Sequence, residues 1–160
     1  MKRLIFVAVV LGAACGGGSA TSGGSGTTAT ASSKTLVNVD AEGVGLGGYD
    51  PTSYAKYGKA VTGTPEFSIA YAGATYRFSS SAQRDTFDGP AQVPQYGGFC
   101  AYAASQGRLS PANPMVFEIL DGKLLVFTNP ELKDLFDKDP TGSKAKADAN
   151  WPGLVAKHGR

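Results

Sequence analysis

Hydrophobic and polar positions alternate in two stretches of the chain, and a short turn containing glycine interrupts each stretch. The first stretch, residues 66–78, turns at Ala72-Gly73, and the second, residues 115–127, turns at Asp121-Gly122. A period of two is typical of half-buried strands, and Asp-Gly between two such runs is among the strongest short hairpin signals. The pattern therefore predicts two β-hairpins.

Capping residues, prolines and glycines predict short helices around these hairpins. Asp50-Pro51 is typical of a helix start, and Gly58 of a helix end. The same signals predict further helical segments at 79–87, 99–106, 130–136 and 144–150. An alternating run at 35–39 predicts one short N-terminal strand. Trp151-Pro152 is expected to end the last helix and lead into a frayed tail. Together these elements predict an α+β domain, with two β-hairpins forming a small antiparallel sheet among several short helices.

The N-terminal residues have the pattern of an export signal. A positive start precedes an apolar run from Leu4 to Leu11, which is shorter than the roughly 20 residues of a membrane span. Small residues then lead to Cys15, as in the cleavage region of a bacterial lipoprotein. We therefore expect a signal peptide at 1–14 and a lipid on Cys15, although ordinary signal cleavage nearby is an alternative.

A run rich in Gly, Ser, Thr and Ala follows Cys15, and we interpret residues 15–34 as a flexible tether. Its r.m.s. reach is about 20–25 Å. The folded domain is then expected at 35–158, exported and held at the envelope membrane by the lipid. No aspartate follows Cys15, which in a Gram-negative host would favour the outer membrane over the inner membrane.

The net charge and the scattered basic residues argue against a nucleic-acid partner. Without Lys2 and Arg3, the chain carries 13 basic and 13 acidic residues, and the basic ones are scattered. Proteins that bind nucleic acid need a concentrated basic surface.

The stretch from Gln95 to Gly107 is the best candidate for a site, because it holds Cys100, the one thiol left if Cys15 carries lipid. A helix starting near Gly98 would place Cys100 in its first turn, where free N–H groups favour a thiolate. Tyr96 and Tyr102, together with Phe99, are expected to line a pocket beside it. The alternative is a core-facing cysteine, since free cysteine is among the most buried residue types.

Catalytic partners for this thiol are not evident in the sequence. The only histidine, His158, lies near the end of the chain and is expected to be solvated. Asp50 and Asp148 are single carboxylates that structural roles can also explain, as a helix cap and as a surface residue respectively. Trp151 can likewise be a core anchor instead of part of a site.

Four motifs together resemble the exported, single-domain branch of the YHS-domain family, over roughly residues 46–155. They are Gly48-Tyr49-Asp50-Pro51, the hairpin from Tyr71 to Ser79, the run from Tyr96 to Ala103, and the run from Lys146 to Pro152. In the wider family, cysteines commonly occupy the positions that look like Ser53 and Ser79 here. Serine is a poor ligand for soft metals, which argues against a zinc or copper knuckle of the usual kind.

The resemblance implies redox chemistry or soft-metal binding at Cys100, with copper or zinc as the metal. Its neighbours would come from Tyr49-Asp50 or from the segment that holds Lys146, Asp148 and Trp151.

Three functions follow from this sequence. The first is a metal- or small-ligand-binding module of the cell envelope that uses Cys100. The second is a thiol-based redox enzyme or sensor, and the third is a non-catalytic envelope interaction protein in which Cys100 only packs.

Overall fold

The structure is a computed structural model that describes residues 34–160. The expected signal peptide, Cys15 and all of the tether except Lys34 lie outside the described residues. Within the described part, no helix combines the length and the hydropathy that a membrane span requires.

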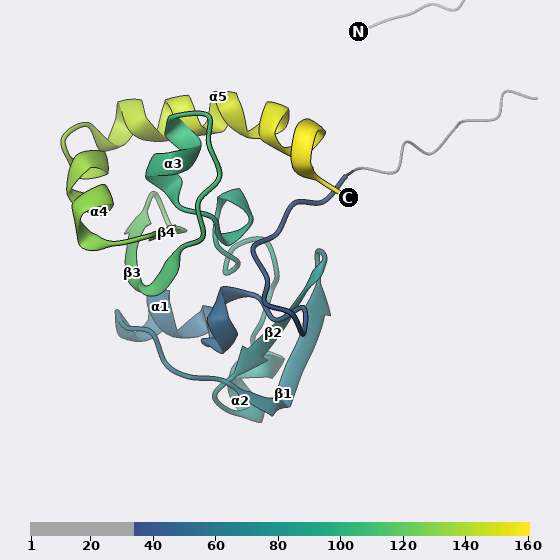
Figure 1. The fold of residues 1–160 in the computed structure, drawn as a ribbon. Helices are drawn as coiled ribbons and strands as arrows, with labels where there is room; N and C mark the ends of the chain where they lie inside the picture. The colour runs from purple at the N-terminus through teal and green to yellow at the C-terminus, as the bar shows by residue number, and fades with distance from the viewer. Residues whose placement is uncertain (1–33) are drawn as a thin grey trace, which may run out of the picture. The chain divides into compact units, whose positions relative to one another are not determined.

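The same series of elements occurs twice along the described chain (Figure 1). Each series begins with a single 3-10 turn, η1 (Leu46–Gly48) or η2 (Tyr96–Gly98). A short helix follows, α1 (Pro51–Tyr57) or α3 (Ala101–Ser105). We call residues 46–87 repeat 1 and residues 96–136 repeat 2.

Each repeat continues with an antiparallel hairpin. In repeat 1 the hairpin pairs β1 (Thr64–Tyr71) with β2 (Ala74–Phe78), and in repeat 2 it pairs β3 (Asn113–Leu120) with β4 (Lys123–Phe127). Both hairpins have a register irregularity at the same place in the first strand, and both turn through two residues with positive φ. The hairpins form two separate two-stranded sheets.

A capped helix closes each repeat, α2 (Ser81–Asp85) in repeat 1 and α4 (Pro130–Asp137) in repeat 2. The side chains of Ser80 and Asn129 accept the N-cap hydrogen bonds from the third residue beyond them. A longer helix, α5 (Pro140–His158), follows repeat 2 and has no counterpart after repeat 1. Two hairpins combined with short helices confirm the predicted α+β class.

The inner face of each hairpin packs into the core of its own repeat. In repeat 1, Tyr76 and Phe78 of β2 lie with Tyr54 of α1. In repeat 2, Leu125 and Phe127 of β4 lie with the small residues of α3. Each core therefore joins a hairpin to a helix that precedes it in the chain.

The outer face of the second hairpin joins the two repeats. Leu124 and Val126 of β4 and Phe117 of β3 belong to the core of repeat 1, where Phe117 meets Tyr54 edge to face at 4.8 Å. The corresponding positions of the first hairpin are Thr75, Arg77 and Ser68, and none of these is buried. The strand that covers another repeat is thus apolar on both faces, whereas the strand with no repeat beyond it is apolar on one face only.

Helix α5 covers the core of repeat 2. It packs along α3 through Ala147 and Leu154 (Figure 1). Asn150 donates to the carbonyl oxygens of Ala104 and Ser105 at 3.1 and 3.0 Å, which satisfies the free C-terminal end of α3.

Two predictions about the ends of the domain are wrong. Residues 35–39 form no strand, because their backbone bonds to separate places, with Thr35 paired to Arg160 and Asn38 to Gly97. The last helix does not end near Asn150 but continues through Pro152 to His158. The proline removes one backbone donor on an exposed side of the helix, while Leu154 beyond it is buried in the core.

Candidate functional site

Cys100 lies in the core of repeat 2 and is fully buried, with 0% of its surface exposed. The prediction that Cys100 lies in the first helical turn is wrong, because α3 begins only at Ala101 and Cys100 is its N-cap, with no capping hydrogen bond from its side chain. Its backbone N–H donates to Ser110, and its side chain lies in the cluster that holds Leu125 and Phe136. The structure therefore places the thiol among apolar side chains.

Part of the predicted neighbourhood does assemble, on the side of η2 that faces α5. The Tyr96 hydroxyl donates to Asp148 at 2.8 Å, and Lys144 donates to the other oxygen of the same carboxylate at 2.8 Å. The rings of Tyr96 and Trp151 meet edge to face at 5.8 Å. Residues predicted from two distant motifs thus share one cluster, although Lys146 is exposed and takes no part in it.

This cluster shifts the pKa of its members. Burial, the hydrogen bond to Asp148 and the negative charge of Asp148 together raise the pKa of Tyr96. Burial opposes ionisation of Asp148, but the hydrogen bonds from Lys144 and Tyr96 outweigh it and lower the pKa of its carboxyl. Tyr102, the other predicted lining residue, is half-buried and packs against the core of repeat 2.

Tyr49 and Asp50 lie in the other repeat, where Asp50 occupies the position that corresponds to Cys100. Asp50 is fully buried, and its carboxylate accepts four hydrogen bonds. Thr52 donates its N–H and hydroxyl to one oxygen at 2.9 and 2.7 Å, and Ser79 does the same to the other oxygen at 2.9 and 2.7 Å. The predicted N-cap role of Asp50 is confirmed.

A chain of hydrogen bonds connects this carboxylate to the surface. Gln83 donates to the Thr52 hydroxyl at 3.0 Å and accepts from Lys56 at 2.7 Å. Ser53 donates to the backbone oxygen of Asp50 at 2.7 Å. We call Asp50, Thr52, Ser79, Gln83 and Lys56 the polar network; it fastens α1 to the start of α2.

Sequence reasoning missed Thr52, Gln83 and Lys56, and it missed the correspondence between Asp50 and Cys100. The signal was present, because Gly-Gly-aromatic occurs at Gly47-Gly48-Tyr49 and again at Gly97-Gly98-Phe99. A search for internal repeats would have found it.

The described residues bring few metal ligands together at either position. From residue 34 to residue 160, no group of three or more His, Cys, Asp or Glu side chains could hold one. The four hydrogen bonds donated to Asp50 use the roughly four acceptor sites of a carboxylate, which leaves none for a cation. Ser79 and Thr52 act there as hydrogen-bond donors.

The chain matches no family model, and no curated protein or solved structure matches it either. The resemblance to the YHS-domain family therefore stays a prediction that rests on the four motifs.

Proposed function

We propose that this chain is a non-catalytic interaction protein of the cell envelope, anchored by lipid on Cys15, in which Cys100 serves packing. The observation that carries the proposal is the complete burial of Cys100 among apolar side chains. Reactive thiols sit in electropositive and partly exposed settings, whereas structural buried cysteines are inert. The YHS resemblance and the export signal support the place of this protein in the envelope.

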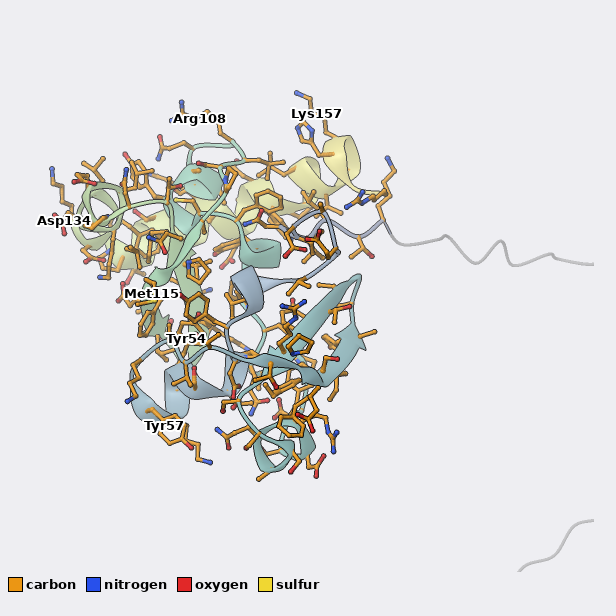
Figure 2. The ribbon with its side chains drawn as sticks, turned by 60° about the horizontal axis from the view of Figure 1, so that its bottom comes forward. Tyr54, Tyr57, Arg108, Met115, Asp134 and Lys157 are labelled. Atoms are coloured by element: carbon orange, nitrogen blue, oxygen red, sulfur yellow. The ribbon has the colours of Figure 1, made fainter. Side chains whose placement is uncertain are left out.

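The candidate surface for a protein partner lies where the two repeats meet. Large apolar side chains are exposed there, with Tyr57 at 49%, Met115 at 56% and Ile119 at 38%. Met115 and Ile119 lie on either side of Phe117 along β3, and Tyr57 is one helical turn beyond Tyr54, which Phe117 contacts. Figure 2 shows Tyr54, Tyr57 and Met115 on the same flank. We call Tyr57, Met115 and Ile119 the junction patch.

Exposed apolar patches of this kind are typical of protein interaction sites. The two hairpins differ at this surface. At the positions that correspond to Met115 and Ile119, the first hairpin carries Glu66 and Ala70. At these two positions, therefore, only the second hairpin carries large apolar side chains.

The role of Cys100 can be tested by the rate at which a disulfide reagent modifies it. In the folded chain, we expect the thiol to react at least about 1,000-fold more slowly than in urea, because reaction requires unfolding of the core. The control is Ser68→Cys in a Cys100→Ala background, which places a thiol on an exposed strand and should react at the unfolded rate. Fast reaction of Cys100 in the native protein would favour the metal or redox function.

The partner surface can be tested in cells with a photo-crosslinking residue at Met115. We expect a discrete crosslinked product that Ile119→Ser weakens. The same crosslinker at Glu66, the equivalent position of the first hairpin, is the matched control. Identical products from both positions, or none from Met115, would contradict this use of the junction patch.

A further inference from the structure

The two ends of the described chain meet at one place, and basic residues gather around it. Thr35 and Arg160 exchange two backbone hydrogen bonds at 2.9 and 3.0 Å. Lys34 donates to the backbone oxygen of Ala156 at 3.0 Å. Figure 1 shows the C-terminus beside the start of the described chain.

Three basic side chains on this surface are exposed: Lys34, Lys157 and Arg160. Figure 2 shows Lys157 pointing outward from the last turn of α5. Neither 34–39 nor 149–160 contains an acidic residue, although the chain from Cys15 onward has equal numbers of acidic and basic residues. Positive charge is thus concentrated at the tether entry of a domain that is neutral overall. We call these three residues the basic face.

An apolar groove of about 250 Å³ opens beside this charge. Leu36, Trp151 and Val155 line it, together with Lys34. Basic side chains next to an aromatic and aliphatic surface are the combination with which proteins contact lipid headgroups.

We propose that the basic face rests on the anionic phospholipid surface of the membrane that holds the lipid anchor. This inference rests on the proposed anchorage at Cys15. The tether supplies the reason that three charges are sufficient. Each basic residue adds only modestly to binding at an anionic surface, so the domain would bind weakly from solution. The expected tether, with an expected reach of about 20–25 Å, would keep the face at a high effective concentration near the headgroups.

Docking has a consequence for the rest of the domain. With the face around α5 and residue 34 toward the lipid, the junction patch on β3 and α1 belongs to a different surface. It stays available to a partner while the domain is docked.

Trp151 makes the proposal measurable, because it is the only tryptophan of the chain. The full lipid-modified protein is reconstituted in vesicles of phosphatidylcholine alone or with one quarter phosphatidylglycerol, each with a headgroup-labelled nitroxide lipid as quencher. We expect at least about twofold more quenching of Trp151 in the anionic vesicles, and a return toward the neutral level at high salt.

The charge variant Lys34→Gln/Lys157→Gln/Arg160→Gln should lose the difference between the two kinds of vesicle. A matched control, Lys59→Gln/Lys123→Gln/Lys138→Gln, removes the same charge elsewhere and should keep it. Circular dichroism of both variants checks that they are folded.

Flotation with the vesicles separates the two ways to fail. Protein that floats but shows equal Trp151 quenching in neutral and anionic vesicles overturns the docking and leaves the anchorage standing. Protein that does not float overturns the anchorage, and the docking with it. A control variant that loses the difference as fully as the charge variant would show that only net charge matters, which also overturns the proposal.

Discussion

Tyr54 is a single residue whose hydroxyl is enclosed without a hydrogen-bond partner. Its side chain is 1% exposed, and no atom of the described chain bonds to its phenolic oxygen. Burial, with Tyr49 and Asp50 nearby, raises the pKa of Tyr54, so the group stays neutral. A buried polar group without a partner costs stability, and this one sits in the core of repeat 1.

We therefore predict that Tyr54→Phe leaves the free energy of unfolding unchanged or raises it by up to about 1 kcal/mol. Urea unfolding measures this change. Tyr96→Phe is the control, because it removes a hydroxyl that does bond, to Asp148, and should cost about 1 kcal/mol. A clear loss of stability in Tyr54→Phe would mean that a buried water serves its hydroxyl.

Asp148 makes the stability of the cluster on α5 depend on pH. Its carboxyl has a lower pKa in the folded chain than its usual 3.8, because the hydrogen bonds from Lys144 and Tyr96 outweigh the effect of burial. A group with a depressed folded pKa adds stability above its unfolded pKa, and that stability is lost as the pH falls through the folded value.

Wild type should accordingly be more stable than Asp148→Asn at neutral pH, and the difference should be smaller at an acidic pH below 3.8. Because Asp148 is about half exposed, with 49% of its side chain accessible, we expect a difference below about 1 kcal/mol. Urea unfolding at both pH values measures it. Asp134→Asn, at an exposed position of α4 (Figure 2), is the control, and an equal pH effect there would contradict the assignment.

Among the elements, the 3-10 turns η1 and η2 can be compared directly, because each has a glycine at the same position. Gly47 and Gly97 hold equivalent positions with φ of 58° and 56°, a region that disfavours every residue with a Cβ. A Cβ on Gly47 would lie 3.2 Å from the ring of Pro114, whereas one on Gly97 would collide with the backbone oxygen of Leu36. The N-terminal segment thus passes too close to η2 for any side chain there.

We predict that Gly47→Ala costs about 1 kcal/mol, from its positive φ alone. Gly97→Ala should cost about 3 kcal/mol or more, since a backbone segment must move as well. Thermal and urea unfolding of the two variants provide the comparison. Equal losses would show that residues 34–39 adapt freely and do not hold η2 in place.

The elements also show what the sequence could and could not reveal. The hairpins were predictable because alternation and the turns Ala72-Gly73 and Asp121-Gly122 are local signals. The continuation of α5 beyond Pro152 was not, because burial of Leu154 depends on the tertiary core. Proximity of the stretch around Cys100 to the segment that holds Asp148 was predicted from two motifs, but the bond between Tyr96 and Asp148 was not. The burial of Cys100 required knowledge of which elements cover α3.

Across the described domain, the polarity of each hairpin's outer face follows one pattern of burial. The outer face of a hairpin is apolar where it covers the other repeat and polar where, among residues 34–160, no further repeat lies beyond it. Val126 and Arg77 hold equivalent positions and differ accordingly. Repeat arrays generally need such polar ends, because an apolar end would bind another copy.

This pattern predicts opposite outcomes for exchanging these two residues. Val126→Arg places a charge in the core of repeat 1 and should prevent stable folding, which circular dichroism detects.

Arg77→Val should leave the fold intact, since Arg77 is half-buried and makes no ion pair within residues 34–160. Together with Thr75→Leu, however, it gives the first hairpin the apolar outer face of the second. We expect this double variant to self-associate in sedimentation experiments at concentrations where the wild type does not. If it behaves as the wild type does, the polar face of the first hairpin is not what keeps the end of the array from pairing.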